Sequence, residues 1–107
     1  MDAAYISTII EKELTASPGV RNWHGITTEN IRQYLVPPHQ EEFQAWNGNP
    51  ITVWVVLDEI PDEPESGYLV VFNSCGQKFG LALKPSQSKP GTVLGFYGTF
   101  LETLAGM

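Results

Sequence analysis

The first part of the chain carries hydrophobic positions at the spacing of an α-helix. Four aliphatic side chains recur three and four residues apart, which places them on one face of a helix over residues 2–15. These positions are Ile6, Ile9, Ile10 and Leu14. Asp2 is suited to cap the first turn, and residues 17–19, which include a proline and a glycine, end the helix. The pattern predicts an amphipathic helix that buries its aliphatic face.

A second, shorter helix is predicted over residues 27–36. Pro37 and Pro38 end it, because proline cannot continue a helix and restricts the residue before it. In the following segment Phe43 and Trp46 stand three residues apart, a spacing that fits one or two further helical turns over residues 41–46.

From residue 51 onward the pattern changes to that of β-strands, rich in β-branched and aromatic residues. The predicted strands cover residues 51–57, 68–73, 78–84 and 92–96, and a last short helix covers residues 97–107. Helices followed by strands with short connections favour an α+β fold. We therefore expect N-terminal helices packed on a three- or four-stranded antiparallel β-meander with a short C-terminal helix, in one domain over residues 1–107.

The pattern also predicts the register of the second hairpin. A four-residue loop over residues 74–77 puts the large apolar side chains on one face, whereas a three-residue loop would mix the two faces. The favoured pairs are Phe72 with Phe79, Val70 with Leu81 and Tyr68 with Leu83. The second face then carries the small residues Gly80 and Ala82, which either a helix or another subunit would cover.

The loop of this hairpin contains the single cysteine, Cys75, followed by Gly76, which is expected to supply a positive φ. A nucleophilic thiol needs an activating group beside it, and a hairpin tip offers none, so Cys75 is interpreted as a turn residue with an ordinary thiol. A catalytic Cys75 is the weakest of three functional hypotheses.

Composition narrows the classes of partner. The chain has 107 residues, 12 acidic and 6 basic, for a net charge of −6, and the basic residues do not cluster. Nucleic acid is therefore not an expected partner, because binding it requires several contacts from lysine and arginine to phosphates. The longest apolar run, residues 53–57, is too short to span a membrane, and the start of the chain lacks a basic signal-peptide region. We expect a cytoplasmic protein without a cofactor.

The strongest charge feature lies between the first two predicted strands. Five acids occur within eight residues that also contain two prolines: Asp58, Glu59, Asp62, Glu63 and Glu65. The simplest interpretation is a solvated loop, but a stiff acidic loop also suits a basic protein partner. The leading hypothesis is a non-enzymatic interaction or accessory module that forms a homodimer or binds such a partner.

The alternative hypothesis is a small-ligand pocket with aromatic walls and a histidine. Its candidate residues are Trp23, His24, Tyr34, His39 and Trp46, most of them in irregular segments. The two histidines and nearby glutamates have no spacing typical of a metal site, so no metal is expected.

Overall fold

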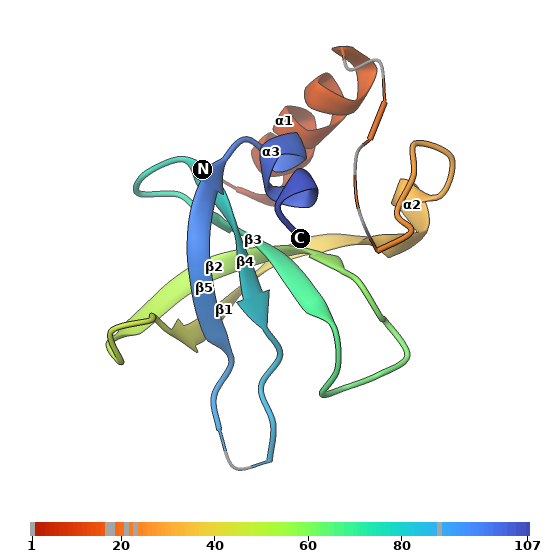
Figure 1. Cartoon of the computed structure of the whole chain (residues 1–107). Helices are drawn as coiled ribbons and strands as arrows, with labels where there is room; N and C mark the ends of the chain where they lie inside the picture. The colour runs from red at the N-terminus through yellow and green to blue at the C-terminus, as the bar shows by residue number, and fades with distance from the viewer. Residues whose placement is uncertain (1, 17–18, 21, 23, 88) are drawn as a thin grey trace.

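The computed structural model describes residues 2–16, 19–20, 22, 24–87 and 89–107. It shows an α+β fold with an N-terminal helix, a five-stranded antiparallel meander and a short C-terminal helix (Figure 1). The elements are α1 (Ala3–Ala16), α2 (Ile31–Tyr34), β1 (Leu35–Gln44), β2 (Pro50–Asp58), β3 (Tyr68–Asn73), β4 (Lys78–Leu83), β5 (Thr92–Gly98) and α3 (Phe100–Ala105). The sheet curls far enough for β5 to meet β1 at one position, which closes the order β1-β2-β3-β4-β5.

The strand that the sequence pattern did not predict is β1, which covers residues that were expected to be helical at both of its ends. The prediction of a helix over residues 27–36 is largely wrong, because only the four residues of α2 are helical, and the helical turns expected over residues 41–46 are absent. The chain becomes extended at Leu35 and continues through Pro37 and Pro38, where the register with β2 shifts. Proline is tolerated there because an edge strand does not need every N–H for its neighbour.

The predicted register of the second hairpin is confirmed. Phe72 pairs with Phe79, Val70 with Leu81 and Tyr68 with Leu83, with four turn residues between the strands. The positive φ of the turn belongs to Gln77, at 52°, and not to Gly76, so that detail of the prediction is wrong. Cys75 lies exposed at the tip, and its backbone N–H donates to the side chain of Asn73.

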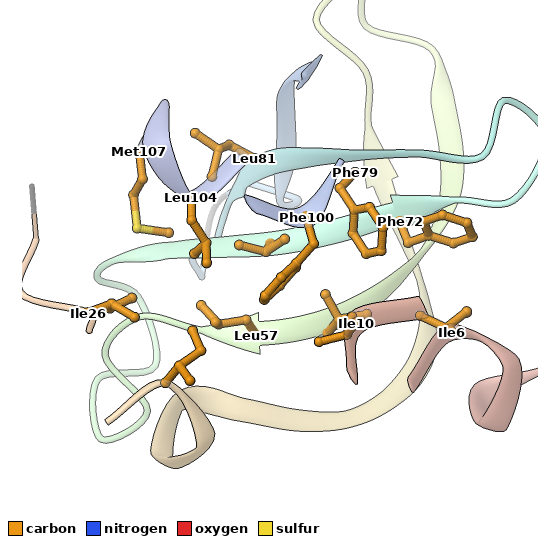
Figure 2. Packing of buried hydrophobic residues seen from close by; sticks show 13 residues of the cluster. Ile6, Ile10, Ile26, Leu57, Phe72, Phe79, Leu81, Phe100, Leu104 and Met107 are labelled. Carbon is orange, nitrogen blue, oxygen red and sulfur yellow. The ribbon is translucent and has the colours of Figure 1, made fainter. Parts of the chain in front are cut away.

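The larger core cluster lies between the sheet and the helices. Ile6 and Ile10 of α1 and Phe100 and Leu104 of α3 are all at most 3% exposed and face the same sheet surface (Figure 2). The rings of Phe72, Phe79 and Phe100 pack in sequence, with centroids 4.7 Å and 5.6 Å apart.

Local hydrogen bonds set the helix ends. The carboxylate of Asp2 accepts from the N–H of Tyr5 at 3.0 Å, as the sequence predicts for an N-cap. α3 begins at Phe100, later than the expected residue 97, because Tyr97 and Gly98 extend β5 and Thr99 forms a capping box with Glu102.

The opposite sheet face forms a second cluster inside the curled sheet. Its buried members are Phe43, Val53, Val55, Leu69, Val71, Ala82 and Val93. Among the residues that the structure describes, no helix belongs to this second cluster around Gly80 and Ala82. A Cβ at Gly80 would collide with the backbone carbonyl oxygen of Gly95, so the small residue is needed for the close approach of β5. The expectation of a helix on this face is wrong, because the residues there are buried inside the curled sheet.

Candidate functional site

The five acids between β2 and β3 have different environments. Asp58, the last residue of β2, lies 2.7 Å from the ammonium of Lys84. Glu59 is only 10% exposed in its side chain; it contacts His24 through one oxygen and accepts the N–H of Tyr68 at 2.9 Å through the other. Asp62, Glu63 and Glu65 are exposed. The acids that remain available to a partner are therefore these last three.

Lys84 fixes the conformation of this loop. Its side chain is 5% exposed, and its Nζ donates to the Asp58 carboxylate at 2.7 Å, to the carbonyl oxygen of Ile60 at 2.7 Å and to that of Glu63 at 2.5 Å. An ammonium has three N–H donors, so all three are used. Lys84 thus acts as a tether that holds the loop against the end of β4, and no amine is left for chemistry.

Lys84 was not among the predicted site residues, although the sequence carries a signal for it. The predicted pairing of Tyr68 with Leu83 already placed Lys84 beside the end of the acidic loop, because the next pair along the hairpin would be Gly67 with Lys84. A lysine at that register position has several carboxylates within reach.

A groove of about 240 Å³ opens between β1, the acidic loop and the start of the β4–β5 connection. Its aliphatic side chains are Val36, Val55 and Leu69, which belong to or pack against the inner core cluster. Three prolines complete its apolar walls: Pro61, Pro64 and Pro85. We call this feature the acid-rimmed groove, because acidic residues from both β1 and the loop line it.

The polar residues of the acid-rimmed groove carry an excess of negative charge. Glu41, Asp58 and Glu63 contribute three carboxylates, against the single ammonium of Lys84. Since Asp58 and Lys84 neutralise each other, the excess comes from Glu41 on β1 and Glu63 on the loop. Both of these residues are exposed, so they can meet a ligand without further desolvation of a buried charge.

His39, like Glu41, lines the acid-rimmed groove from β1. Its Nδ1 lies 3.0 Å from the carbonyl oxygen of Pro37 and its Nε2 lies 3.1 Å from the carboxylate of Glu41. Both neighbours are acceptors, so a ring N–H can donate to the carbonyl oxygen from Nδ1 or to the carboxylate from Nε2, depending on the tautomer. The half-exposed imidazole therefore orients Glu41 at the mouth of the groove.

The residues expected to form an aromatic pocket occupy separate places. His39 lies in the acid-rimmed groove, whereas His24 pairs with Glu59 and has its ring 5.6 Å from that of Tyr68. Tyr34 packs against the larger core cluster, and Trp46 is 81% exposed in the turn after β1. Trp23 lies outside the described residues. What the structure does bring together is His39 with two of the acids expected to bind a partner, Asp58 and Glu63.

Neither a metal cluster nor a membrane-spanning helix occurs in the part of the chain that the structure describes. No three side chains of histidine, cysteine, aspartate or glutamate gather there in a way that could hold a metal ion. None of the helices in the described ranges has the length and apolarity needed to cross a membrane. Comparison with protein-family models, with curated proteins and with solved structures found no match for this chain.

Proposed function

We propose that this chain is a protein-interaction module that binds a basic, extended segment of a partner protein in the acid-rimmed groove. The observation that supports it is the combination of an apolar lining with exposed carboxylates on both sides, Glu41 from β1 and Glu63 from the loop. A lysine or arginine side chain matches this combination, because its aliphatic stem buries against apolar surface while its charged head reaches a carboxylate.

The tether through Lys84 supports the same proposal. It ties the backbone at Ile60 and Glu63, so the acidic side of the groove is preorganised before a partner arrives. A site that needs no ordering on binding loses less free energy when its ligand docks. The net charge of −6 adds electrostatic steering toward a basic partner.

The size of the groove favours a protein segment over a metabolite. Its volume of about 240 Å³ is below the roughly 300–1,000 Å³ of pockets that enclose small ligands. A side chain of a bound segment needs only part of such a volume, and the rest of the segment contacts the surface outside it. The alternative of a metabolite pocket lined by aromatic residues has no comparable support.

A pair of charge-matched variants tests the proposal. The probe is a blocked hexapeptide of glycine, leucine, arginine, leucine, arginine and glycine, whose affinity is measured by fluorescence anisotropy with a dye on its end. The double variant Glu41→Gln with Glu63→Gln should weaken binding roughly 2- to 30-fold, because it removes two exposed ion pairs that contribute about 0.2–1 kcal/mol each. The loss should shrink at 0.5 M salt, where exposed charges are screened.

The control variant changes the net charge of the protein by the same amount, but at positions outside the groove. Glu29→Gln with Glu42→Gln also removes two negative charges, but both residues are exposed and neither lines the groove. It should bind the probe within about twofold of the native protein, because only long-range steering is altered. Equal losses in both variants, or binding of a glutamate version of the peptide as tightly as the arginine version, would refute the groove as the binding site.

A further inference from the structure

The turn between β1 and β2 contains the one asparagine of this chain that a glycine follows (Figure 1). Asn47 precedes Gly48, whereas the other four asparagines precede larger residues. The backbone nitrogen of the next residue can attack an asparagine side chain, and it does so most readily in glycine, which has no side chain to block the approach. Both residues are exposed, so water reaches them. The covalent structure at this turn therefore favours deamidation of Asn47.

The reaction needs only water and releases ammonia. The backbone nitrogen of Gly48 loses its proton to solvent and forms a bond to Cγ of Asn47, and the side-chain nitrogen takes up a proton and leaves as ammonia. The product is a five-membered succinimide ring. Water then opens the ring at one of its two carbonyl carbons. One opening gives aspartate, and the other gives isoaspartate, in which the main chain runs through the former side-chain carbonyl.

The native turn holds both reacting groups in hydrogen bonds. The N–H of Gly48 donates to the carbonyl oxygen of Ala45 at 2.8 Å, and Oδ1 of Asn47 accepts the N–H of Asn49 at 3.1 Å. Two more bonds close the turn, from the N–H of Ala45 to the carbonyl oxygen of Asn49 at 2.7 Å and from Nε2 of Gln44 to that of Gly48 at 3.2 Å. The nitrogen that must attack is therefore engaged while the turn is closed.

We propose that Asn47 is a site of spontaneous deamidation and that opening of the β1–β2 turn sets its rate. Trp46 beside it is 81% exposed, so its ring adds little packing that would hold the turn closed. Closure depends on the hydrogen bonds, and an exposed turn opens more readily than the core of a sheet. None of the residues that line the acid-rimmed groove belongs to this turn, so the proposal does not depend on what the groove binds.

The two products differ in their effect on the turn. Aspartate keeps the length of the main chain, and its carboxylate can accept the N–H of Asn49 as the amide oxygen does. Isoaspartate adds one atom to the main chain between residues 47 and 48, which changes the spacing of the groups that form the backbone bonds of the turn. We therefore expect the aspartate product to keep the native hairpin and the isoaspartate product to disrupt its turn.

Peptide mapping by mass spectrometry measures the conversion at each asparagine. The protein is incubated in mildly alkaline buffer, either native or unfolded in guanidinium chloride, and is then cleaved after glutamate. Cleavage after Glu42 and Glu59 releases a peptide that contains both Asn47 and Asn49. Conversion of Asn47 should be at least about tenfold slower in the native protein, because the nitrogen of Gly48 is free there only while the turn is open.

Asn49 is a matched control within the same peptide. The residue after it is Pro50, whose backbone nitrogen has no proton to lose, so Asn49 should stay unchanged in both samples. Gln44→Ala is a second control, because it removes the donor to the carbonyl oxygen of Gly48 and leaves the reacting groups in place. It should speed the conversion of Asn47 about two- to fivefold in the native protein and leave the rate in the unfolded chain unchanged.

Each outcome decides one part of the proposal. Equal rates in native and unfolded protein, or no acceleration in native Gln44→Ala, would show that the turn does not control the reaction. No conversion of Asn47 in the unfolded chain, or equal conversion of Asn49, would refute the assignment of the site. Asn47→Asp tests the aspartate product separately. Amide hydrogen exchange over residues 44–49 should stay within about threefold of the native rates, and much faster exchange would contradict a fit of aspartate to the turn.

Discussion

Replacing Lys84 with methionine should release the acidic loop and destabilise the fold. The Lys84 side chain is 5% exposed, and methionine keeps most of its aliphatic stem but removes the ammonium that donates to three acceptors. Breaking one side of a fully buried ion pair costs about 3–5 kcal/mol. Asp58 is 21% exposed, so water recovers part of that loss. We expect the free energy of unfolding to fall by about 2–3 kcal/mol.

Urea denaturation followed by tryptophan fluorescence measures this change, and a double-mutant cycle locates it. Asp58→Asn is combined with Lys84→Met, and the two should show a coupling of about 1–2 kcal/mol because they share one ion pair. The coupling should persist in 1 M salt, since a buried pair is screened little. Lys78→Met is the control, as Lys78 is an exposed lysine at the start of β4 and should change stability by less than about 0.5 kcal/mol.

Lys84 would not be a stabilising tether if Lys84→Met lowered the free energy of unfolding no more than Lys78→Met does. The tether would also be refuted if the coupling with Asp58 disappeared in salt, which is the behaviour of a surface ion pair. Amide hydrogen exchange of the loop adds a structural readout. Exchange over residues 60–66 should speed up in Lys84→Met and stay unchanged in Lys78→Met.

Three further predictions follow from individual contacts. Gly80→Ala should lower the free energy of unfolding by about 1–3 kcal/mol, because its Cβ meets the backbone of β5, whereas Gly76→Ala, with open space around it, should be nearly neutral in the same thermal denaturation. The hydrogen bond from Arg32 lowers the pKa of Glu11, so this pair stabilises the fold above the ordinary glutamate pKa and loses that effect as pH falls through the lowered value. Arg32→Gln should bring the pKa of Glu11 back toward its usual range in a carboxyl NMR titration. Cys75 should react with iodoacetamide at a rate within about threefold of a free thiol peptide, and a much faster rate would contradict its assignment as a turn residue.

The parts of the fold that the sequence predicted are those with a strong hydrophobic period. In α1 the aliphatic stripe and Asp2 gave both the helix and its cap. In the β3–β4 hairpin only one register put Phe72 and Phe79 on the same face, and that register is the one observed. In both cases a single face must be buried, so a shift in the pattern would expose it.

β1 could not be recognised in the same way. Most of its residues are exposed on both faces, and Phe43 is the one fully buried side chain among them, so no alternation appears in the sequence. The strand exists because β2 offers it a hydrogen-bonding partner through a hairpin, which is a tertiary cause that the local pattern does not contain.

The candidate site was predicted in pieces. The acidic loop and His39 were identified from their residue types, but in two separate hypotheses. The pairing of β1 with β2 brings His39 next to Asp58 and Glu63, and the tether through Lys84 holds the acidic loop at this groove. The first of these depends on β1, which the sequence pattern did not predict, and for this reason the groove was missed.

Chemical-shift mapping on the protein, with the arginine-containing hexapeptide as ligand, tests whether the acid-rimmed groove is the binding site for a basic segment. The protein is labelled on its valine and leucine methyl groups and titrated with the peptide. If the peptide binds in the acid-rimmed groove, the largest shifts should fall on Val36, Val55 and Leu69, which line it. Shifts confined to the helices or to the β3–β4 turn, or no shift at millimolar peptide, would contradict it.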